Sequence, residues 1–199
     1  MSPADALDAE RLAEALSGQR IGSRVVVLEE TTSTNDVVFA MAAENGDAGL
    51  VVFAERQTAG RGQHGRRWES AAGKGLWFSI LLGRGITAEE APRLTSWAAR
   101  TVAGTIARVL TVRATVKPPN DVYIANRKVA GVLLELRAVP SAPHRGILGV
   151  GVNANQTERE FPEELRGTAT SLSIATGRAI DRHDIAIALL RDLDRTYPL

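Results

Sequence analysis

The segment Gln57–Trp68, with the sequence QTAGRGQHGRRW, has the residue types of an anion-binding loop. Its glycines allow positive φ angles that expose backbone N–H groups, and its arginines carry fork-shaped donors that fit phosphate and carboxylate oxygens. The segment lacks the Gly-Lys-Ser/Thr ending of a Walker A loop, and no helix follows it to receive a phosphate as in a dinucleotide fingerprint. Because a flexible basic surface loop is the alternative, the segment alone favours anion binding only modestly.

Two further segments place a lysine next to a strand. Lys117 precedes Pro118-Pro119 and the pair Asn120-Asp121, whose oxygen-bearing side chains could bind a ligand or simply suit a rigid turn. Lys128 opens the apolar stretch 128–135, in which Gly131 leaves room for a ligand against the backbone. A lysine at a strand start more commonly points into solvent, so neither segment decides the function alone.

Small and hydroxyl-bearing residues complete the pattern. Gly149–Asn153 (GVGVN) is a glycine-interrupted strand that permits close approach to the backbone, or else marks a tight bend. Thr31–Asn35 (TTSTN) opens a helix with groups that could cap it or bind a polar ligand, and capping explains one of these residues but not all of them. Each segment is weak evidence, whereas all of them in this order and spacing are far more specific.

The elements that must position these segments mix strands and helices without strict alternation. Ser33 and Asp181 are the expected N-caps of two helices. Residues 123–129 read as two strands joined by a tight turn, which requires an antiparallel pair, and residues 138–145 read as an exposed loop. The predicted strands span residues 25–28, 50–54, 76–82, 112–116, 129–136 and 147–152, and the predicted helices span residues 4–16, 34–44, 89–110 and 182–195.

This pattern predicts an α+β fold with a mixed, partly antiparallel sheet and helices packed on one face. A length of 199 residues is sufficient for one substantial core. Neither a linker nor an internal repeat divides the chain. We therefore expect residues 1–199 to form a single domain, in which residues 1–20 contribute an N-terminal helix.

Composition excludes several classes of function. The 24 Lys and Arg residues nearly balance the 23 Asp and Glu residues, so no global field favours nucleic acid or an anionic membrane. The absence of cysteine excludes disulfides, thiol nucleophiles and Cys-based metal sites, and the three histidines lack metal-ligand spacing. The sequence contains neither a signal peptide nor a membrane-spanning run, and we expect a soluble, cytoplasmic protein.

From about Val25 to the last predicted helix, the sequence resembles the catalytic domain of the biotin–protein ligases, also called biotin–[acetyl-CoA-carboxylase] ligases. The resemblance implies the class II synthetase-like fold of the biotin and lipoate ligases. It also implies that biotin attacks the α-phosphate of ATP, with Mg²⁺, to give biotinyl-5′-AMP, and that a lysine of a biotin carboxyl carrier protein domain then takes the biotinyl group. The motifs that carry the resemblance are Ser33-Thr34-Asn35, Gln57–Gly62, Lys117 with Pro119-Asn120-Asp121, Lys128–Glu135 and Gly149–Asn153.

The resemblance implies a role for each matching residue. Lys128 and Arg61 are expected to be catalytic, because their charge would stabilise the reacting carboxylate and phosphate. Asp121 is the expected metal ligand. The residues expected to bind biotin are Ser33, Thr34, Asn35, Gln57, Arg61, Gly62, Gln63, Trp68, Lys128 and Gly131, and those expected to bind ATP or the adenylate are Arg61, Arg66, Lys117, Asn120, Asp121 and Asn153.

The sequence departs from the family pattern in three places. Gln63 replaces a usual third arginine of the loop, which predicts faster release of biotinyl-AMP. Pro118 replaces a usual tryptophan, which removes an aromatic platform and stiffens the turn. The chain ends at Leu199, where bacterial members commonly continue into an SH3-like domain, so we expect that domain to be absent or truncated.

Two alternatives follow from the same residues. A lipoate or octanoate ligase would share the fold, but the Gly-Arg-Gly loop and the Lys-x-x-Gly strand favour biotin. A non-catalytic paralogue that binds biotin or biotinyl-AMP is the second, and retention of both Arg61 and Lys128 argues against it. A repressor-ligase is disfavoured because too little chain precedes Val25 for a DNA-reading module.

The expected partner is the carrier domain of a biotin-dependent carboxylase, with neither nucleic acid nor membrane. A homodimer is considered because dimers are common in the family.

Overall fold

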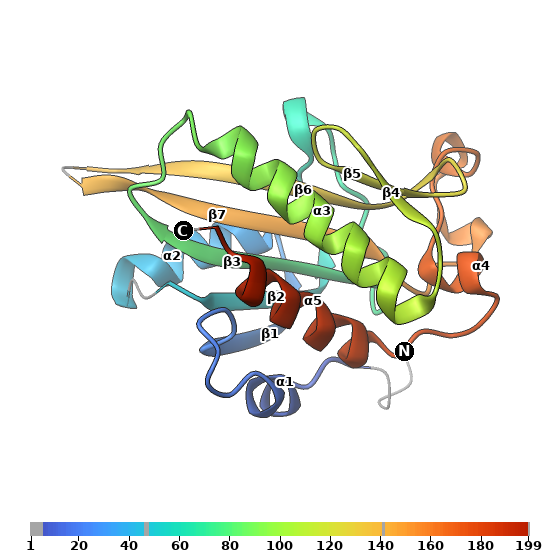
Figure 1. Cartoon of the computed structure of the whole chain (residues 1–199), viewed down its shortest axis with the longest axis horizontal. Coiled ribbons are helices and arrows are strands. Elements are labelled where there is room, and N and C mark those ends of the chain that lie inside the picture. Colours follow the sequence, from blue (N-terminus) through green and yellow to red (C-terminus); the bar gives the residue numbers. More distant parts are fainter. Residues whose placement is uncertain (1–5, 46–47, 141, 199) are drawn as a thin grey trace.

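The computed structural model describes residues 6–45, 48–140 and 142–198. In this part of the chain, one seven-stranded sheet has the order β1-β2-β3-β7-β6-β5-β4 (Figure 1). The strands are β1 (Arg24–Thr31), β2 (Leu50–Gln57), β3 (Gly75–Arg84), β4 (Ala114–Lys117), β5 (Asp121–Ile124), β6 (Arg127–Val139) and β7 (Ala142–Asn153). The helices are α1 (Ala9–Ala15), α2 (Thr34–Asn45), α3 (Ala91–Leu110), α4 (Leu172–Thr176) and α5 (Arg182–Thr196), with 3-10 helices η2 (Gln63–Gly65), η3 (Glu158–Glu160) and η4 (Glu163–Leu165).

The sheet is mixed and mostly antiparallel, which confirms the predicted α+β class. β1 and β2 pair in parallel, with α2 as the crossover between them, and the other neighbouring strands are antiparallel. The predicted tight turn is also confirmed. Ala125 and Asn126 have positive φ angles of 49° and 62° and join β5 to β6 in a two-residue hairpin.

The prediction of a loop at residues 138–145 is wrong. β6 continues to Val139 and β7 begins at Ala142, while residue 141 lies outside the described residues. Arg145 pairs with Arg137 of β6 and with Arg84 of β3, so β7 is a central strand at this point. Prolines near a strand start remove few ladder hydrogen bonds, and pairing on both sides therefore outweighs the local turn signal.

The remaining predicted elements are present with shifted ends. β4 begins at Ala114 instead of residue 112, and α3 begins at Ala91 instead of residue 89. Asp181 is confirmed as an N-cap, because its side chain accepts the N–H of Asp184. Of the predicted helix 4–16, residues 4 and 5 lie outside the described residues, and α1 begins after Asp8, whose carboxylate accepts two backbone N–H groups.

Alternate residues of the central strands point to opposite faces of the sheet, and each face has its own core. Val51 and Phe53 of β2 belong to the larger core with α1, α3 and α5, whereas Leu50 and Val52 belong to a smaller core with Val38 of α2. Helices α1, α3 and α5 pack on one face of the sheet, as predicted. The structure corrects the prediction for α2, which lies behind the sheet in Figure 1, because helical periodicity does not specify which face a crossover covers.

A buried ion pair ties the N-terminal segment and α5 to the sheet. Arg182 and Glu55 are almost fully buried, and Nη1 of Arg182 lies 2.6 Å from Oε2 of Glu55. Glu55 Oε1 accepts the N–H of Leu7, and Nε2 of His183 accepts the N–H of Asp8. These contacts fix the chain ends of the domain on the side away from α2. None of the described helices is long and apolar enough to cross a membrane.

Candidate functional site

A cavity of about 500 Å³ opens on the sheet face that α3 and α5 leave uncovered. Its walls come from the start of α2, the loop after β2, the β4–β5 turn, the strands β6 and β7, and the segment after β7. Every residue that the sequence predicted as a site residue lines this cavity. The tertiary structure therefore brings together motifs that are separated by more than a hundred positions in the chain.

A neutral hydrogen-bonding network forms one end of the cavity, at the start of α2. Oε1 of Gln57 accepts the backbone N–H of Thr34 at 2.9 Å, so this carboxamide has a defined orientation. Ser79 of β3 lies 2.6 Å from the Thr34 hydroxyl and donates to Oδ1 of Asn35 at 2.5 Å. Nδ2 of Asn35 is buried and has no hydrogen-bond partner among the described residues. Ser33, the predicted N-cap, is a buried neighbour whose carbonyl accepts the N–H of Val37.

Two glycines of β7 make room for side chains of the site. A Cβ atom at Gly149 would lie 2.7 Å from Oδ1 of Asn35, and one at Gly151 would lie 2.6 to 2.8 Å from the ring of Trp68. Real Cβ atoms do not approach other atoms so closely, so both side chains depend on the missing methyl groups. The glycine-interrupted strand is therefore straight sheet with a recessed surface, and the alternative of a tight bend is wrong.

Trp68 forms the floor between the two ends of the cavity. Its ring meets Trp77 edge-on with centroids 6.0 Å apart, and it lies against the space above Gly131 and Gly151. Nζ of Lys128 lies 5.1 Å from its ring centroid, within range of a cation–π interaction. The indole N–H is buried and has no hydrogen-bond partner among the described residues.

The glycine-arginine segment folds as a short irregular hairpin beside the cavity. Gly62 donates its N–H to Arg66 O at 2.6 Å, and Trp68 donates to Gly60 O at 2.9 Å. The tip is η2, where His64 adopts a left-handed φ of 57°. These bonds, together with those from the N–H groups of Thr58 and Ala59 to the carbonyls of Thr31 and Thr32, give the segment a defined hairpin conformation.

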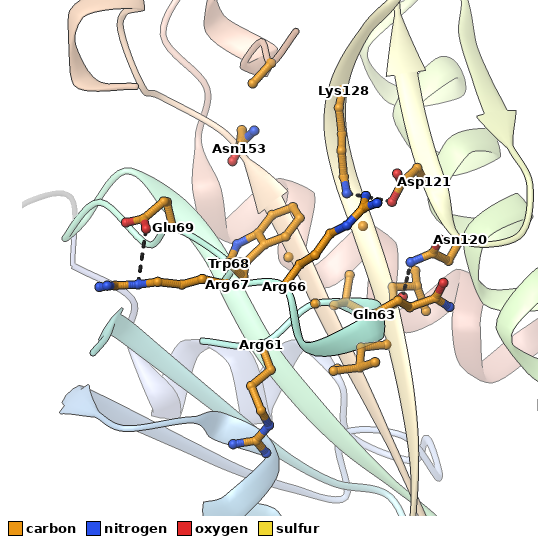
Figure 2. A pocket seen from close by; sticks show the side chains of 18 of the residues that line it. Arg61, Gln63, Arg66, Arg67, Trp68, Glu69, Asn120, Asp121, Lys128 and Asn153 are labelled. Carbon is orange, nitrogen blue, oxygen red and sulfur yellow. Dashed lines mark hydrogen bonds and ion pairs between the residues drawn. The ribbon is translucent and has the colours of Figure 1, made fainter. Parts of the chain in front are cut away.

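The side chain of Arg61 points away from those of Arg66, Arg67 and Lys128 (Figure 2). Its guanidinium makes two hydrogen bonds of 2.8 Å with Asp36 and two of 3.0 and 3.3 Å with Glu135. Arg137 contacts the same two carboxylates at 2.6 Å. The hydrogen bonds from Arg61 hold the pKa of Asp36 below its usual value of 3.8. Arg61 therefore links the loop to α2 and β6, and its charge is already paired.

Lys128 and Asp121 form the charged end of the cavity. Nζ of Lys128 lies 2.6 Å from Oδ1 of Asp121, and both side chains are mostly buried. Figure 2 shows Arg66 extending from the loop toward this side of the cavity. Lys117 lies farther out, with Nζ 5.5 Å from the ring centroid of Tyr123. Lys128, Lys117 and Arg66 thus lie on this side of the cavity, and Lys128, like Arg61, is paired with a carboxylate.

The two asparagines predicted to bind ATP, Asn120 and Asn153, both donate hydrogen bonds to backbone carbonyls. Nδ2 of Asn120 donates to Val132 O at 2.8 Å and fixes the β4–β5 turn against β6. Nδ2 of Asn153 donates to Thr170 O at 3.0 Å, and its Oδ1 accepts from Gln156. These bonds support the cavity wall, because they join segments that are distant in sequence.

The segment after β7 forms a wall that the sequence patterns did not predict. Lys128 donates its N–H to Thr168 O at 2.7 Å and accepts from the N–H of Thr170 at 2.8 Å, which docks the segment on β6. It has irregular structure with two 3-10 helices, so no periodic pattern marked it. Ser79 was also missed, although a lone hydroxyl in an apolar strand is a usable signal. The lining residues of this wall are Gln156, Glu160, Phe161, Pro162, Leu165, Thr168 and Ala169.

Residues 27–153 match the Biotin/lipoate A/B protein ligase family. The Bifunctional ligase/repressor BirA of Bacillus subtilis is 35% identical over 92% of this chain and 56% of its own length. The Biotin--[acetyl-CoA-carboxylase] ligase of Mycobacterium tuberculosis is 37% identical over 94% of this chain and 70% of its own length. The chain thus spans little more than half the length of the bifunctional relatives.

Solved structures agree with the sequence matches. The biotin protein ligase from Aquifex aeolicus in complex with biotin and ATP superimposes with a TM-score of 0.72 at 33% identity, over 86% of this chain and 68% of that one. The biotin protein ligase from Leishmania major in complex with biotinyl-5-AMP gives a TM-score of 0.67 at 25% identity, over 85% of this chain and 72% of that one. The observed sheet and its helices are therefore a fold that biotin protein ligases share.

Proposed function

We propose, because the chain belongs to the biotin/lipoate A/B protein ligase family, that it activates biotin with ATP and transfers it to a carrier protein. In the first step a carboxylate oxygen of biotin attacks the α-phosphorus of ATP, and the bond to pyrophosphate breaks to give biotinyl-5′-AMP. In the second step a lysine amine attacks the biotinyl carbonyl, loses a proton and displaces AMP, which leaves an amide.

One observation carries this proposal: a single cavity joins a neutral hydrogen-bonding end to a cationic end. The neutral end contains Thr34, Asn35 and Gln57, which suit a polar ring without charge. The cationic end contains Lys128, with Arg66 directed toward it. A molecule with a ureido ring at one end and a carboxylate at the other matches this polarity along its length.

The chemistry at the cationic end is electrostatic. Attack of a carboxylate on a phosphate brings two anions together, so fixed positive charge lowers the barrier where negative charge accumulates. We assign this role to Lys128, whose Nζ is held by Asp121 and stacked over Trp68. The loop that carries Trp68 lines the cavity beside the reacting end and would limit the access of water to the acyl-phosphate anhydride.

Mg²⁺ belongs to the same proposal, with Asp121 as its protein ligand. Among the described residues, no group of three or more His, Cys, Asp or Glu side chains could hold a metal ion. Mg²⁺ commonly binds through one or two carboxylates together with substrate phosphates and water, so a single cavity carboxylate fits an ion that arrives with ATP. The ion would draw negative charge from the leaving pyrophosphate.

The wall formed after β7 is the part of the cavity that we assign to the nucleotide. Phe161, Pro162 and Leu165 offer an apolar surface, and they lie on the segment docked against Lys128. A purine base could lie on this surface while its phosphates reach Lys128 and Arg66. The assignment is independent of Pro118, which stands where the family usually has an aromatic residue.

The acceptor, the location and the domain limits complete the proposal. A carrier domain of a biotin-dependent carboxylase is the acceptor, as the name of the Mycobacterium tuberculosis relative implies for that protein. Cytoplasmic action is proposed because ATP is supplied there. We treat residues 1–199 as one catalytic domain, supported by the single sheet and the core that α1, α3 and α5 share with it.

Calorimetric titration with biotin, with and without ATP and Mg²⁺, combined with a pyrophosphate assay, tests the proposal. We expect biotin binding together with ATP-dependent pyrophosphate release, followed by a biotinylated carrier lysine detected by mass spectrometry. Binding without pyrophosphate would favour the non-catalytic alternative. If biotin does not bind, the assignment is wrong, and lipoate and octanoate are the ligands to titrate next.

A further inference from the structure

Ser79 lies in the middle of β3 and is fully buried, and it touches two residues of the cavity although it does not line the cavity itself. Its Oγ lies 2.6 Å from Oγ1 of Thr34 and 2.5 Å from Oδ1 of Asn35. The neighbours of Ser79 in the sequence are apolar from residue 76 to residue 82. A lone hydroxyl at the centre of an apolar strand therefore joins the two side chains that form the neutral end.

The direction of each hydrogen bond follows from the number of protons. An amide oxygen can only accept, so Ser79 gives its single proton to Oδ1 of Asn35 and must accept from Thr34. The hydroxyl of Thr34 therefore donates its single proton to Oγ of Ser79, at 2.6 Å. It does not donate to Oε1 of Gln57, which is more distant at 3.1 Å and already accepts the backbone N–H of Thr34.

Two atoms at the neutral end consequently have fixed and opposite roles. Oγ1 of Thr34 has used its proton and keeps a lone pair that can accept a hydrogen bond. Nδ2 of Asn35 keeps N–H groups that no described residue accepts, and it is buried beside the cavity. A cyclic urea carries an N–H donor next to a carbonyl acceptor, which is the complement of this pair. A ring without a carbonyl leaves the buried Nδ2 of Asn35 unpaired, and a ring without N–H groups gives the free lone pair of Thr34 no donor.

We propose that Ser79 is a specificity-determining positioning residue, which sets the donor and acceptor pattern that selects a ureido ring. The inference rests on the proposed function and explains how the cavity prefers biotin to other acids. Without Ser79, the carboxamide of Asn35 is free to turn its oxygen toward the cavity, and Thr34 is free to donate to Gln57. Both changes would reverse the pattern and weaken the preference.

The test compares Ser79→Ala with the wild-type chain in binding biotin and 2-iminobiotin. 2-Iminobiotin replaces the ring carbonyl by a cationic group that only donates, so Nδ2 of Asn35 should oppose it. We expect Ser79→Ala to weaken biotin binding about tenfold, the effect of losing one or two ordered hydrogen bonds. We also expect the ratio of the Kd for 2-iminobiotin to the Kd for biotin to fall about tenfold in this variant. The KM for ATP should change less than about twofold.

A matched control removes another buried hydroxyl on the opposite face. Thr105 of α3 is 1% exposed and bonds to Asp192, so Thr105→Val should leave both ligand affinities unchanged. If Ser79→Ala does not fold, as judged by thermal unfolding, Ser79→Cys replaces it, because a thiol of similar size hydrogen-bonds weakly.

The outcomes separate this inference from the function on which it rests. A folded Ser79 variant with an unchanged biotin to 2-iminobiotin ratio would overturn the role in specificity. An equal loss of biotin and ATP binding would also overturn the role in specificity, because that result indicates disruption of the whole cavity and not of its neutral end. Failure of the wild-type chain to bind biotin would instead refute the proposed function itself.

Discussion

Arg61 holds Asp36 through two parallel hydrogen bonds of 2.8 Å, so the arginine of the glycine-arginine loop is anchored to the first turn of α2. The same turn carries Asn35, which forms part of the neutral end of the cavity. A bidentate pair fixes orientation as well as distance. The loop and the neutral end are therefore joined by Arg61, a residue for which the family resemblance implied a catalytic role.

If Arg61 acts as an anchor, Asp36→Asn should reproduce the effect of Arg61→Ala. We expect both to raise the biotin KM about tenfold, and Arg61→Lys to resemble Arg61→Ala because lysine lacks the fork. The free energy of unfolding should fall by less than about 1 kcal/mol, because the side chains of Arg61 and Asp36 are both more than a third exposed. Steady-state kinetics decide between the roles: a normal Asp36→Asn with full rescue by Arg61→Lys would mean that the charge of Arg61 acts directly on the substrate.

Lys128 should carry most of the electrostatic stabilisation of adenylation. We expect Lys128→Ala to slow biotin-dependent pyrophosphate release by about 100-fold or more, the usual cost of removing one oxyanion-stabilising group. Arg67→Ala is the matched control, because Arg67 pairs with Glu69 and points away from Asp121 in Figure 2. Equal effects of the two substitutions would show that the loss reflects general charge and not the position of Lys128.

We expect a side chain at Gly149 to weaken biotin binding without preventing the domain from folding. A methyl group there would displace Asn35, so Gly149→Ala should raise the biotin Kd at least about tenfold in calorimetry. Gly104 in the middle of α3 has open space around it, and Gly104→Ala should raise the melting temperature, with a gain of up to about 1 kcal/mol and no change in biotin binding. A normal Kd for Gly149→Ala would mean that Asn35 does not contact the ligand.

Gln63 begins η2 at the tip of the loop and lines the cavity, where a cation would face the adenylate. We expect Gln63→Arg to slow the release of preformed biotinyl-AMP about fivefold, which corresponds to about 1 kcal/mol for a partly exposed charge pair. Release can be followed by rapid filtration of the enzyme–adenylate complex. Identical release rates for the wild type and the variant would refute the prediction.

The stability of the domain should fall between neutral and mildly acidic pH because of His183. Burial lowers the pKa of this imidazole below 6.5, and its Nε2 accepts the N–H of Asp8, which requires the neutral form. The unfolded chain binds the proton first, so the contribution of His183 is complete above pH 6.5 and is lost as the pH falls through the lower pKa of the folded state.

Urea unfolding at several pH values measures this loss. His183→Gln keeps a side-chain acceptor but does not titrate, so we expect its free energy of unfolding to fall less between pH 7 and pH 5 than that of the wild type. A wild-type curve with the same slope as that of the variant would mean that His183 does not contribute to the pH dependence.

The sequence alone predicted most of the strands, the longer helices and part of the site, but not the start of β7, α4 or the cavity wall after β7. Period-two and period-3.6 patterns predicted the strands and the longer helices, and the tight turn at Ala125-Asn126 was recognisable from local turn chemistry. Motif types identified the residues that line the cavity, because glycines, hydroxyls and cations in apolar surroundings are unusual. Local patterns depend only on neighbours along the chain, so they predict local elements but not contacts between distant segments.

Only the tertiary structure decided what each side chain does. Arg61 and Lys128 looked equivalent in sequence, but Arg61 is paired with carboxylates of α2 and β6, whereas Lys128 and its partner Asp121 lie at the charged end of the cavity. Ser79 gained its role from two residues more than forty positions away. The face covered by α2, and the cavity wall that follows β7, likewise depend on contacts between distant segments. Residue types limit the chemistry that is available, whereas packing determines which charges are paired and which donors remain for a ligand.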